Sequence, residues 1–339
     1  GAVLVTKTTM PDYGMLSSGL SSIHATARNP WDLSRTPGGS SAGAGSAAAA
    51  GYGPLHLGTD IGGLAICYRA DLFKAAGLPT DREEVGKLWP TWEDYVKVGS
   101  DFISKTPDKK VKWYDGAGHV MTGILAQEKN TFYDDQGEVI AGTNPVVKQA
   151  WDLSVTSIQA KQSAALAEFS PEWNTGFQQG QFATITCPAW MTAYIRNNAP
   201  ETKGKWDIAT VPGGSGNWGG SFLTVPKAGK HTAEAVDLAK YLTTPDTAVK
   251  VFKEFGNYPS PVKTWDLPEV EDAKDAFFSD APVGVIFPKS FANLPEQAAG
   301  PQSGVIGVAL NTALNQVEQG EDPTTAWEKA LKDIEAAAG

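Results

Sequence analysis

Residues 58–64 (Gly-Thr-Asp-Ile-Gly-Gly-Leu) divide this 339-residue chain into two parts of different composition. Before this segment the chain is rich in Gly, Ser and Ala. After it, apolar strand patterns alternate with helical patterns. Of the 11 tryptophans only Trp31 precedes residue 64. We therefore interpret the chain as two segments, residues 1–63 and 64–339, that meet at a glycine-rich junction.

Composition excludes several classes of function. A hydrophobic content of 41% and a charged content of 19% are those of a water-soluble globular protein. The length suffices for two lobes with separate cores. A net charge of −10 argues against nucleic-acid or anionic-membrane partners, because both require a basic patch. No apolar run approaches the roughly 20 residues that span a bilayer.

Few residues suit a metal, a cofactor or a processing signal. The four histidines are scattered without metal-ligand spacing, so we expect neither a metal site nor a cofactor. Cys67 and Cys187 allow one intramolecular pairing, and both a disulfide and two buried thiols remain open. We also expect no signal peptide and no lipid anchor within this sequence.

The first segment carries two glycine-rich motifs after a short apolar strand at residues 2–5. Residues 29–43 read Asn-Pro-Trp-Asp-Leu-Ser-Arg-Thr-Pro-Gly-Gly-Ser-Ser-Ala-Gly, and residues 57–63 read Leu-Gly-Thr-Asp-Ile-Gly-Gly. Together they resemble the amidase signature family, in which such loops frame an active site. The resemblance implies a Ser–Ser–Lys hydrolase whose backbone N–H groups stabilise an oxyanion.

The catalytic set of that family is incomplete here. Ser40 matches its bridging serine. The nucleophile position directly after Gly-Gly holds Leu64, which cannot attack a carbonyl. The catalytic lysine belongs to a segment upstream of the first signature strand, and Lys7 lies in a different motif. The resemblance therefore implies an inactive amidase-like fragment.

The second segment carries two further motifs. Residues 64–79 read Leu-Ala-Ile-Cys-Tyr-Arg-Ala-Asp-Leu-Phe-Lys-Ala-Ala-Gly-Leu-Pro, an apolar strand followed by a short helix. Residues 177–190 read Phe-Gln-Gln-Gly-Gln-Phe-Ala-Thr-Ile-Thr-Cys-Pro-Ala-Trp, a helix end with a glycine turn and a strand of alternating residues. This segment resembles the extracellular solute-binding proteins of bacterial sugar ABC transporters.

That second resemblance implies a fold, a ligand and a location. The fold is α/β, a two-lobe periplasmic-binding-protein fold of type II, with the first lobe incomplete or replaced by the amidase-like α/β fragment. The ligand is a neutral oligosaccharide, captured non-covalently between lobes that close about a hinge. The partners are the permease subunits of an ABC importer, and the chain is a monomer. Its location is extracellular, as a membrane-anchored lipoprotein, or periplasmic.

Candidate ligand-binding residues combine flat aromatic faces with hydrogen-bonding groups. The resemblance places Trp190 against a sugar ring. Trp218 lies between glycines that leave it poorly covered, which suits a residue that contacts a ligand. Aromatic and polar neighbours complete the predicted set: Trp173, Asn174, Asn217, Trp113 and Asp60. A cleft carboxylate at Asp60 accepts hydrogen bonds from sugar hydroxyls.

Helix boundaries are marked by capping residues. Asn144, Thr244 and Asp322 each precede a proline and predict helix starts. Thr80 with Glu83 has the spacing of a capping box. The last helix is predicted to bury apolar residues at helical spacing: Ala326, Trp327, Ala330, Leu331 and Ile334.

Three functional interpretations follow. The first is a sugar-binding protein, and the second is an amidase signature hydrolase. The third is a chimera with neither function, in which residues 38–53 are cleaved by protease while residues from 64 onward resist. The origin of the junction as a natural fusion, an engineered chimera or an error of sequence assembly stays open. The sugar also stays open among cellobiose-like, maltose-like and xylose-based ligands.

Overall fold

One long strand, β1 (His56–Arg69), runs through the centre of the protein. The computed structural model describes residues 56–338 apart from residues 226–228, 293, 296 and 301. The first half of β1 pairs with β5 (Asn217–Thr224) and β6 (Tyr258–Pro259), and its second half pairs with β3 (Phe182–Pro188) and β4 (Trp206–Thr210). The boundary predicted at 63/64 falls inside this continuous strand. The predicted strand 2–5 and Ser40 lie outside the described residues.

The sheet around the second half of β1 is covered on both faces. Its strand order is β2 (Lys112–Tyr114), β3, β1 and β4, with β2 parallel to β3 and the other pairs antiparallel. Alternate residues of β1 enter two cores: Leu64 and Ile66 enter one, and Ala65 and Cys67 the other. The strand predicted there is confirmed as β3, and it is buried along its whole length. A strand with helices on both faces has no solvent side.

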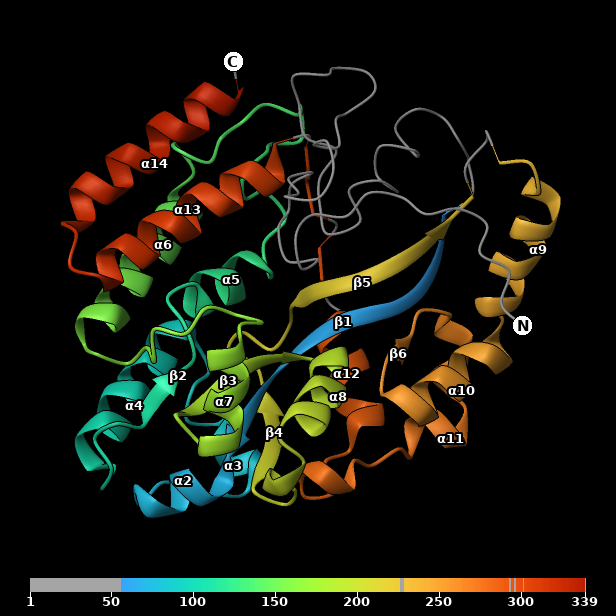
Figure 1. Ribbon diagram of the computed structural model, residues 1–339, viewed down its shortest axis with the longest axis horizontal. Helices are drawn as coiled ribbons and strands as arrows, with labels where there is room; N and C mark the ends of the chain where they lie inside the picture. The colour runs from blue at the N-terminus through green and yellow to red at the C-terminus, as the bar shows by residue number, and fades with distance from the viewer. Residues whose placement is uncertain (1–55, 226–228, 293, 296, 301, 339) are drawn as a thin grey trace.

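Helices surround this sheet in three groups (Figure 1). One core includes residues of α2 (Ala70–Ala75), α3 (Arg82–Gly86) and α4 (Trp92–Lys105). A second core lies on the opposite face and includes residues of α7 (Pro171–Gln179), α8 (Ala189–Asn198), α10 (Pro245–Phe255), α11 (Pro268–Glu271) and α12 (Val283–Ala292). A third core joins α5 (His119–Leu125), α6 (Pro145–Gln159), α13 (Ser303–Glu318) and α14 (Pro323–Ala338). The 3-10 turns are η2 (Pro200–Thr202), η3 (Val262–Thr264) and η4 (Ala276–Phe278).

A small fourth core joins Val225, directly after β5, to Ala235 and Ala239 of helix α9 (Thr232–Leu242). Large apolar side chains stay exposed beside it, including Phe222 at 68% and Tyr241 at 61%. None of the described helices is both long enough and apolar enough to cross a bilayer.

Two glycines lie where β1 passes from its pairing with β5 and β6 to its pairing with β3 and β4. A Cβ atom on Gly62 would overlap the carbonyl oxygen of Trp218, and one on Gly63 would overlap the carbonyl oxygen of Phe287. Register shifts interrupt the β1–β5 ladder at the same place. The glycines of the junction therefore allow neighbouring backbone segments to approach β1 closely. Leu64 follows as a core residue, 1% exposed.

Capping predictions are largely confirmed. Asn144, Thr244 and Asp322 cap α6, α10 and α14. The capping box at Thr80 was wrong, because Asp81 caps α3 and accepts hydrogen bonds from two N–H groups of its first turn. In the last helix Ala326, Ala330 and Ile334 are buried as predicted.

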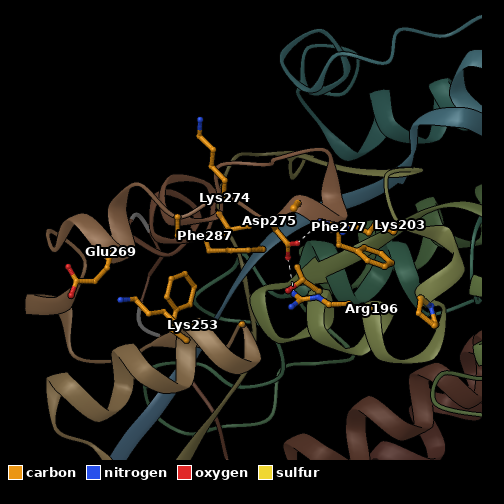
Figure 2. A pocket seen from close by; sticks show the side chains of 15 residues that line it. Arg196, Lys203, Lys253, Glu269, Lys274, Asp275, Phe277 and Phe287 are labelled. Carbon is orange, nitrogen blue, oxygen red and sulfur yellow. Dashed lines mark hydrogen bonds and ion pairs between the residues drawn. The ribbon is translucent and has the colours of Figure 1, made fainter.

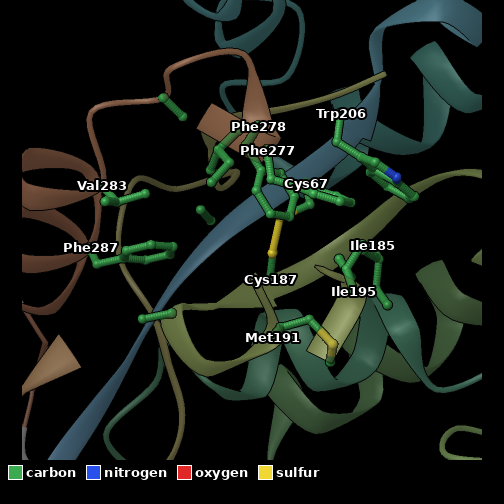
Figure 3. Close-up of a cluster of buried hydrophobic side chains, with 14 of the residues drawn as sticks. Cys67, Ile185, Cys187, Met191, Ile195, Trp206, Phe277, Phe278, Val283 and Phe287 are labelled. Carbon is green, nitrogen blue, oxygen red and sulfur yellow. A yellow bond between two sulfur atoms is a disulfide. The ribbon is translucent and has the colours of Figure 1, made fainter. Parts of the chain in front are cut away.

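A disulfide joins Cys67 of β1 to Cys187 of β3 (Figure 3), which decides between the two alternatives that the sequence left open. Both cysteines are fully buried in the core that contains α7 and α8. The bond closes a loop with a sequence separation of 120 residues.

Candidate ligand-binding site

Four half-buried aromatic side chains form one continuous cluster, here called the aromatic surface: Phe169, Trp190, Tyr194 and Trp218. The indole Nε1 of Trp190 donates a 2.9 Å hydrogen bond to the carbonyl oxygen of Trp218, and the two rings meet edge to face at 5.2 Å. The ring of Phe169 lies nearly parallel to Trp190, at 6.3 Å and 22°. Such flat, partly exposed rings suit the apolar faces of sugar rings.

Local structure explains why these rings meet. Helix α8 begins directly after β3 ends, which puts Trp190 in its first turn and Tyr194 one turn later on the same face. Trp218 lies on β5, beside the point where β1 changes sheets. The surface therefore joins β5, which pairs with the first half of β1, to α8, which follows a strand paired with the second half.

Phe169 reaches the surface from a strained loop. Its φ is 64°, and Lys161 and Ala165 of the same loop also have positive φ values. Residues other than glycine are strained in this region, and such strain clusters at ligand sites. Ser170 then caps α7, which fixes the end of the loop.

Polar groups border the aromatic surface. The hydroxyl of Tyr194 donates to Oδ1 of Asn174 at 2.7 Å, and burial raises the pKa of Tyr194. Asn217 accepts from the backbone N–H of Gly62 at 3.0 Å and donates to the carbonyl of Gly219 at 3.1 Å. Its side-chain amide therefore links β5 to β1 at the point where β1 changes its pairing partners.

Asp60 lies on the first half of β1. Its carboxylate accepts from Thr59 Oγ1 at 2.7 Å and from Asn257 Nδ2 at 3.2 Å. Because an ionised carboxylate has about four acceptor positions, it retains capacity for further hydroxyl groups.

Two predicted ligand residues lie inside the protein instead of on a binding surface. Trp113 and Trp173 are both 0% exposed. Trp113 packs among Phe73, Tyr95 and Phe102, and Trp173 donates its Nε1–H to Asp115 at 2.8 Å. The expectation that they stack on a ligand is corrected: a fully buried ring presents no face to one.

Two members of the aromatic surface were missed. Tyr194 follows Trp190 by four residues, which is a readable helical signal. Phe169 carries no such signal, because its position depends on the loop conformation.

A separate cavity of about 560 Å³ lies between α8, α10 and η4 (Figure 2). Arg196 and Asp275 form a 2.9 Å ion pair in it, and Lys253 and Glu269 also line it. The side chain of Lys274 points away from the ion pair in Figure 2. None of the predicted ligand residues lines this cavity. Among the described residues, no group of three His, Cys, Asp or Glu side chains has metal-binding geometry.

The comparison with protein families decides the assignment. The family model described as bacterial extracellular solute-binding protein matches residues 41–279, which is more than half of the chain. The chain belongs to this family. A crystal structure of an extracellular solute-binding protein of family 1 agrees: it is 40% identical with a TM-score of 0.77, and covers 84% of this chain and 73% of its own.

Other relatives of the solute-binding family share the fold. The arabinooligosaccharide-binding protein of Halalkalibacterium halodurans is 23% identical over 302 residues, which is 84% of this chain and 65% of the relative. The ABC transporter associated binding protein from B. animalis subsp. lactis Bl-04 was solved with beta-1,6-galactobiose. It is 21% identical with a TM-score of 0.66, and covers 83% of this chain and 74% of its own. The type II two-lobe fold predicted from sequence is thus confirmed.

The amidase resemblance is confirmed for the first segment. The amidase family model matches residues 1–64. A glutamyl-tRNA(Gln) amidotransferase polypeptide of Symbiobacterium thermophilum is 56% identical over 63 residues, which is 19% of this chain and 13% of that protein. The two family matches overlap in residues 41–64. The chain spans about an eighth of such amidotransferases and 65% of the arabinooligosaccharide-binding protein.

Proposed function

We propose that this protein captures a neutral oligosaccharide non-covalently at the aromatic surface and presents it to the permease subunits of an ABC importer. The observation that carries the proposal is the group of half-buried rings around Trp190 and Trp218, beside the strand that joins the two sheets. The relatives named for arabinooligosaccharide binding and solved with galactobiose support the class of ligand.

Trp190 is the proposed stacking residue, with Trp218 beside it. Asn174, Asn217 and Asp60 are the proposed hydrogen-bonding groups, and Asn174 reaches the surface through Tyr194. Trp173 and Trp113 support the site from the interior. Binding of this kind needs no covalent step, so no catalytic residue is assigned.

The proposed division of the chain lies at the glycine-rich junction. Residues 64–339 form the solute-binding region, with the second lobe and part of the hinge, and residues 1–63 are an amidase-like fragment that contributes no hydrolysis. Leu64 supports the absence of hydrolysis, because its side chain is buried in a core beside β1. A Leu64→Ser substitution should therefore leave amide hydrolysis at background while it lowers stability.

The proposed location is extracellular, in a lipoprotein-anchored or periplasmic form. The buried Cys67–Cys187 disulfide supports an oxidising compartment. The proposed monomeric state is tested by light scattering over a range of concentrations, where a mass that rises with concentration would refute it.

Isothermal titration with a panel of arabino-oligosaccharides, beta-1,6-galactobiose, maltose and cellobiose tests the function. We expect saturable binding by at least one sugar, weakened roughly 30-fold in Trp190→Ala and unchanged in Trp327→Ala. Trp327 is a matched control because it packs against Trp151 in the third core. Absence of binding across the panel by folded protein would overturn the proposal. Hydrolysis of glutamine or a simple amide would instead favour the amidase alternative.

A further inference from the structure

A chain of hydrogen-bonding groups runs through the buried interior next to the aromatic surface. Asp115 Oδ1 lies 3.1 Å from Nδ1 of His119, and Nε2 of His119 lies 2.8 Å from the hydroxyl of Tyr95. That hydroxyl lies 2.6 Å from Oγ1 of Thr184, which in turn donates to the carbonyl oxygen of Trp113 at 2.6 Å. Asp115 is 1% exposed and His119 is 2% exposed.

If His119 is neutral, the four contacts of this hydrogen-bond chain share only three hydrogens. With its proton on Nδ1, directed at the Asp115 carboxylate, Nε2 must accept the hydroxyl hydrogen of Tyr95. The hydroxyl hydrogen of Thr184 is used on the Trp113 carbonyl. The 2.6 Å contact between Tyr95 and Thr184 would then join two oxygens without a hydrogen between them.

One additional proton satisfies every contact. If both ring nitrogens carry hydrogens, His119 donates to Asp115 and to Tyr95, Tyr95 donates to Thr184, and Thr184 donates to the Trp113 carbonyl. We infer that both ring nitrogens of His119 carry hydrogens, so that an imidazolium cation pairs with the Asp115 carboxylate. Asp115 is the better site for the negative charge because it also accepts the Nε1–H of Trp173 at 2.8 Å.

The surroundings of the ring favour the cation. The imidazole lies between two tyrosine rings, at 4.8 Å and 16° from Tyr114 and at 5.5 Å and 12° from Tyr95. Aromatic faces attract a cation. A buried carboxylate such as Asp115 also requires a compensating positive charge. His119 begins α5, whose N-terminus disfavours a cation, but the adjacent carboxylate offsets that effect over a shorter distance.

Burial raises the pKa of the other titratable groups around the pair. Glu168 faces it from the loop before α7, and burial followed by the charge of Asp115 raises its pKa to about 8. Glu318 faces it from α13, and burial raises its pKa. Tyr95 and Tyr114 stay neutral because burial raises the pKa of each hydroxyl. Asp115 is the carboxylate in direct contact with His119, at 3.1 Å.

The pair also supports the aromatic surface. Asp115 holds Trp173, whose ring contacts Phe169 at 5.1 Å and Tyr194 at 5.2 Å. His119 thus acts as a positioning residue, since it orients the carboxylate that fixes Trp173 beneath the ligand-facing rings. This second step rests on the proposed function, whereas the protonation of His119 does not.

Nitrogen-15 NMR of the histidine rings tests the inference in the whole chain. We expect both ring nitrogens of His119, whose signals are identified by their absence in His119→Gln, to carry hydrogens at pH 7. His231, whose side chain is 72% exposed, is the internal reference for a histidine outside the buried hydrogen-bond chain. A single protonated ring nitrogen on His119 at pH 7 would overturn the inference, and a bare Nδ1 would place the proton on Asp115 instead.

Two tyrosine variants separate the hydrogen-bond chain from the effect of burial. Tyr95→Phe removes the acceptor of the Nε2 hydrogen, so His119 should show a single protonated ring nitrogen at pH 7. Tyr114→Phe keeps a ring against His119 and loses only its contact with Ser157, so both ring hydrogens should remain. The same number of ring hydrogens in both variants would overturn the role of the hydrogen-bond chain. Thr184→Val is the second test: Tyr95 then directs its hydrogen to Nε2, and His119 should again show a single protonated ring nitrogen.

Sugar titration tests the positioning role. In wild-type protein that binds a sugar, His119→Gln should weaken affinity at least threefold, while His231→Gln should not. Unchanged affinity in His119→Gln would overturn the positioning role. A wild-type protein that binds no sugar but shows a doubly protonated His119 ring counts against the proposed function and leaves the ion pair supported.

Discussion

The indole N–H of Trp190 donates to the backbone carbonyl of Trp218 at 2.9 Å, and this bond ties helix α8 to strand β5. The two residues belong to elements that pair or pack with different halves of β1. A Cβ atom on Gly62 would overlap the same carbonyl of Trp218. The rings of the aromatic surface and the glycines at the β1 crossing therefore depend on one small region, and sequence changes in either should affect both.

Substitution of Trp190 separates its stacking face from its hydrogen bond. Trp190→Phe keeps an aromatic face and loses the N–H donor, whereas Trp190→Ala loses both. Truncation of a central aromatic contact costs about 2 kcal/mol, so Trp190→Ala should weaken sugar binding roughly 30-fold. Trp190→Phe should weaken it less. Calorimetric titration measures both, and equal losses would show that the N–H bond, not the ring, sets affinity.

Gly62→Ala should destabilise the fold. Its Cβ would overlap the Trp218 carbonyl, and the backbone must move to admit it, at a cost of about 1–3 kcal/mol. Gly307→Ala is the matched control. Gly307 lies inside α13, and a Cβ there meets only Phe132 at 3.9 Å. That variant should gain roughly 0.5–1 kcal/mol. Urea denaturation should show changes in unfolding free energy of opposite sign in the two variants. A Gly62→Ala variant as stable as wild-type protein would contradict the close-approach argument.

Sequence motifs predicted the architecture well where they mark backbone requirements. The glycine turn at Gly180 ends α7 in the left-handed conformation, and Asn144 and Thr244 begin helices as their positions before proline indicate. Such features are local, because the residue itself fixes the dihedral angles or satisfies the end of a helix.

Burial of individual aromatics was not predictable in the same way. Trp173 and Trp190 both lie near polar neighbours in sequence, yet one is fully buried and the other half-exposed. The difference arises from Asp115, 58 residues away from Trp173, which satisfies its N–H inside the core. A long-range partner of this kind leaves no periodic signal. The pairing of Cys67 with Cys187 was open for the same reason.

Loss of the disulfide should lower stability considerably. A bond that closes a loop with a separation of 120 residues restricts the unfolded chain, and removal of such a bond typically costs about 2–5 kcal/mol. Because both cysteines are buried in a core, the double variant Cys67→Ala, Cys187→Ala keeps apolar side chains at both positions. Thermal unfolding with and without reductant measures the effect. The variant should be insensitive to reductant, and wild-type protein unaffected by complete reduction would contradict the prediction.

Glu168 should make the protein less stable as the pH rises. Burial, with the charge of Asp115 as a second cause, raises the pKa of Glu168 to about 8, above its ordinary value of about 4.3. The folded state thus binds the proton more tightly than the unfolded state, so stability is full below about pH 4 and falls as the pH rises toward 8. Part of the residue reaches the surface, where water solvates the ionised form, so we expect a fall of only about 1–3 kcal/mol.

Glu168→Gln keeps the shape without the charge and should flatten this part of the profile, whereas Glu172→Gln, on the exposed first turn of α7, should not. Urea denaturation from pH 5 to 8.5 measures both variants, and an identical slope in Glu168→Gln and wild-type protein would assign the pH dependence to another group.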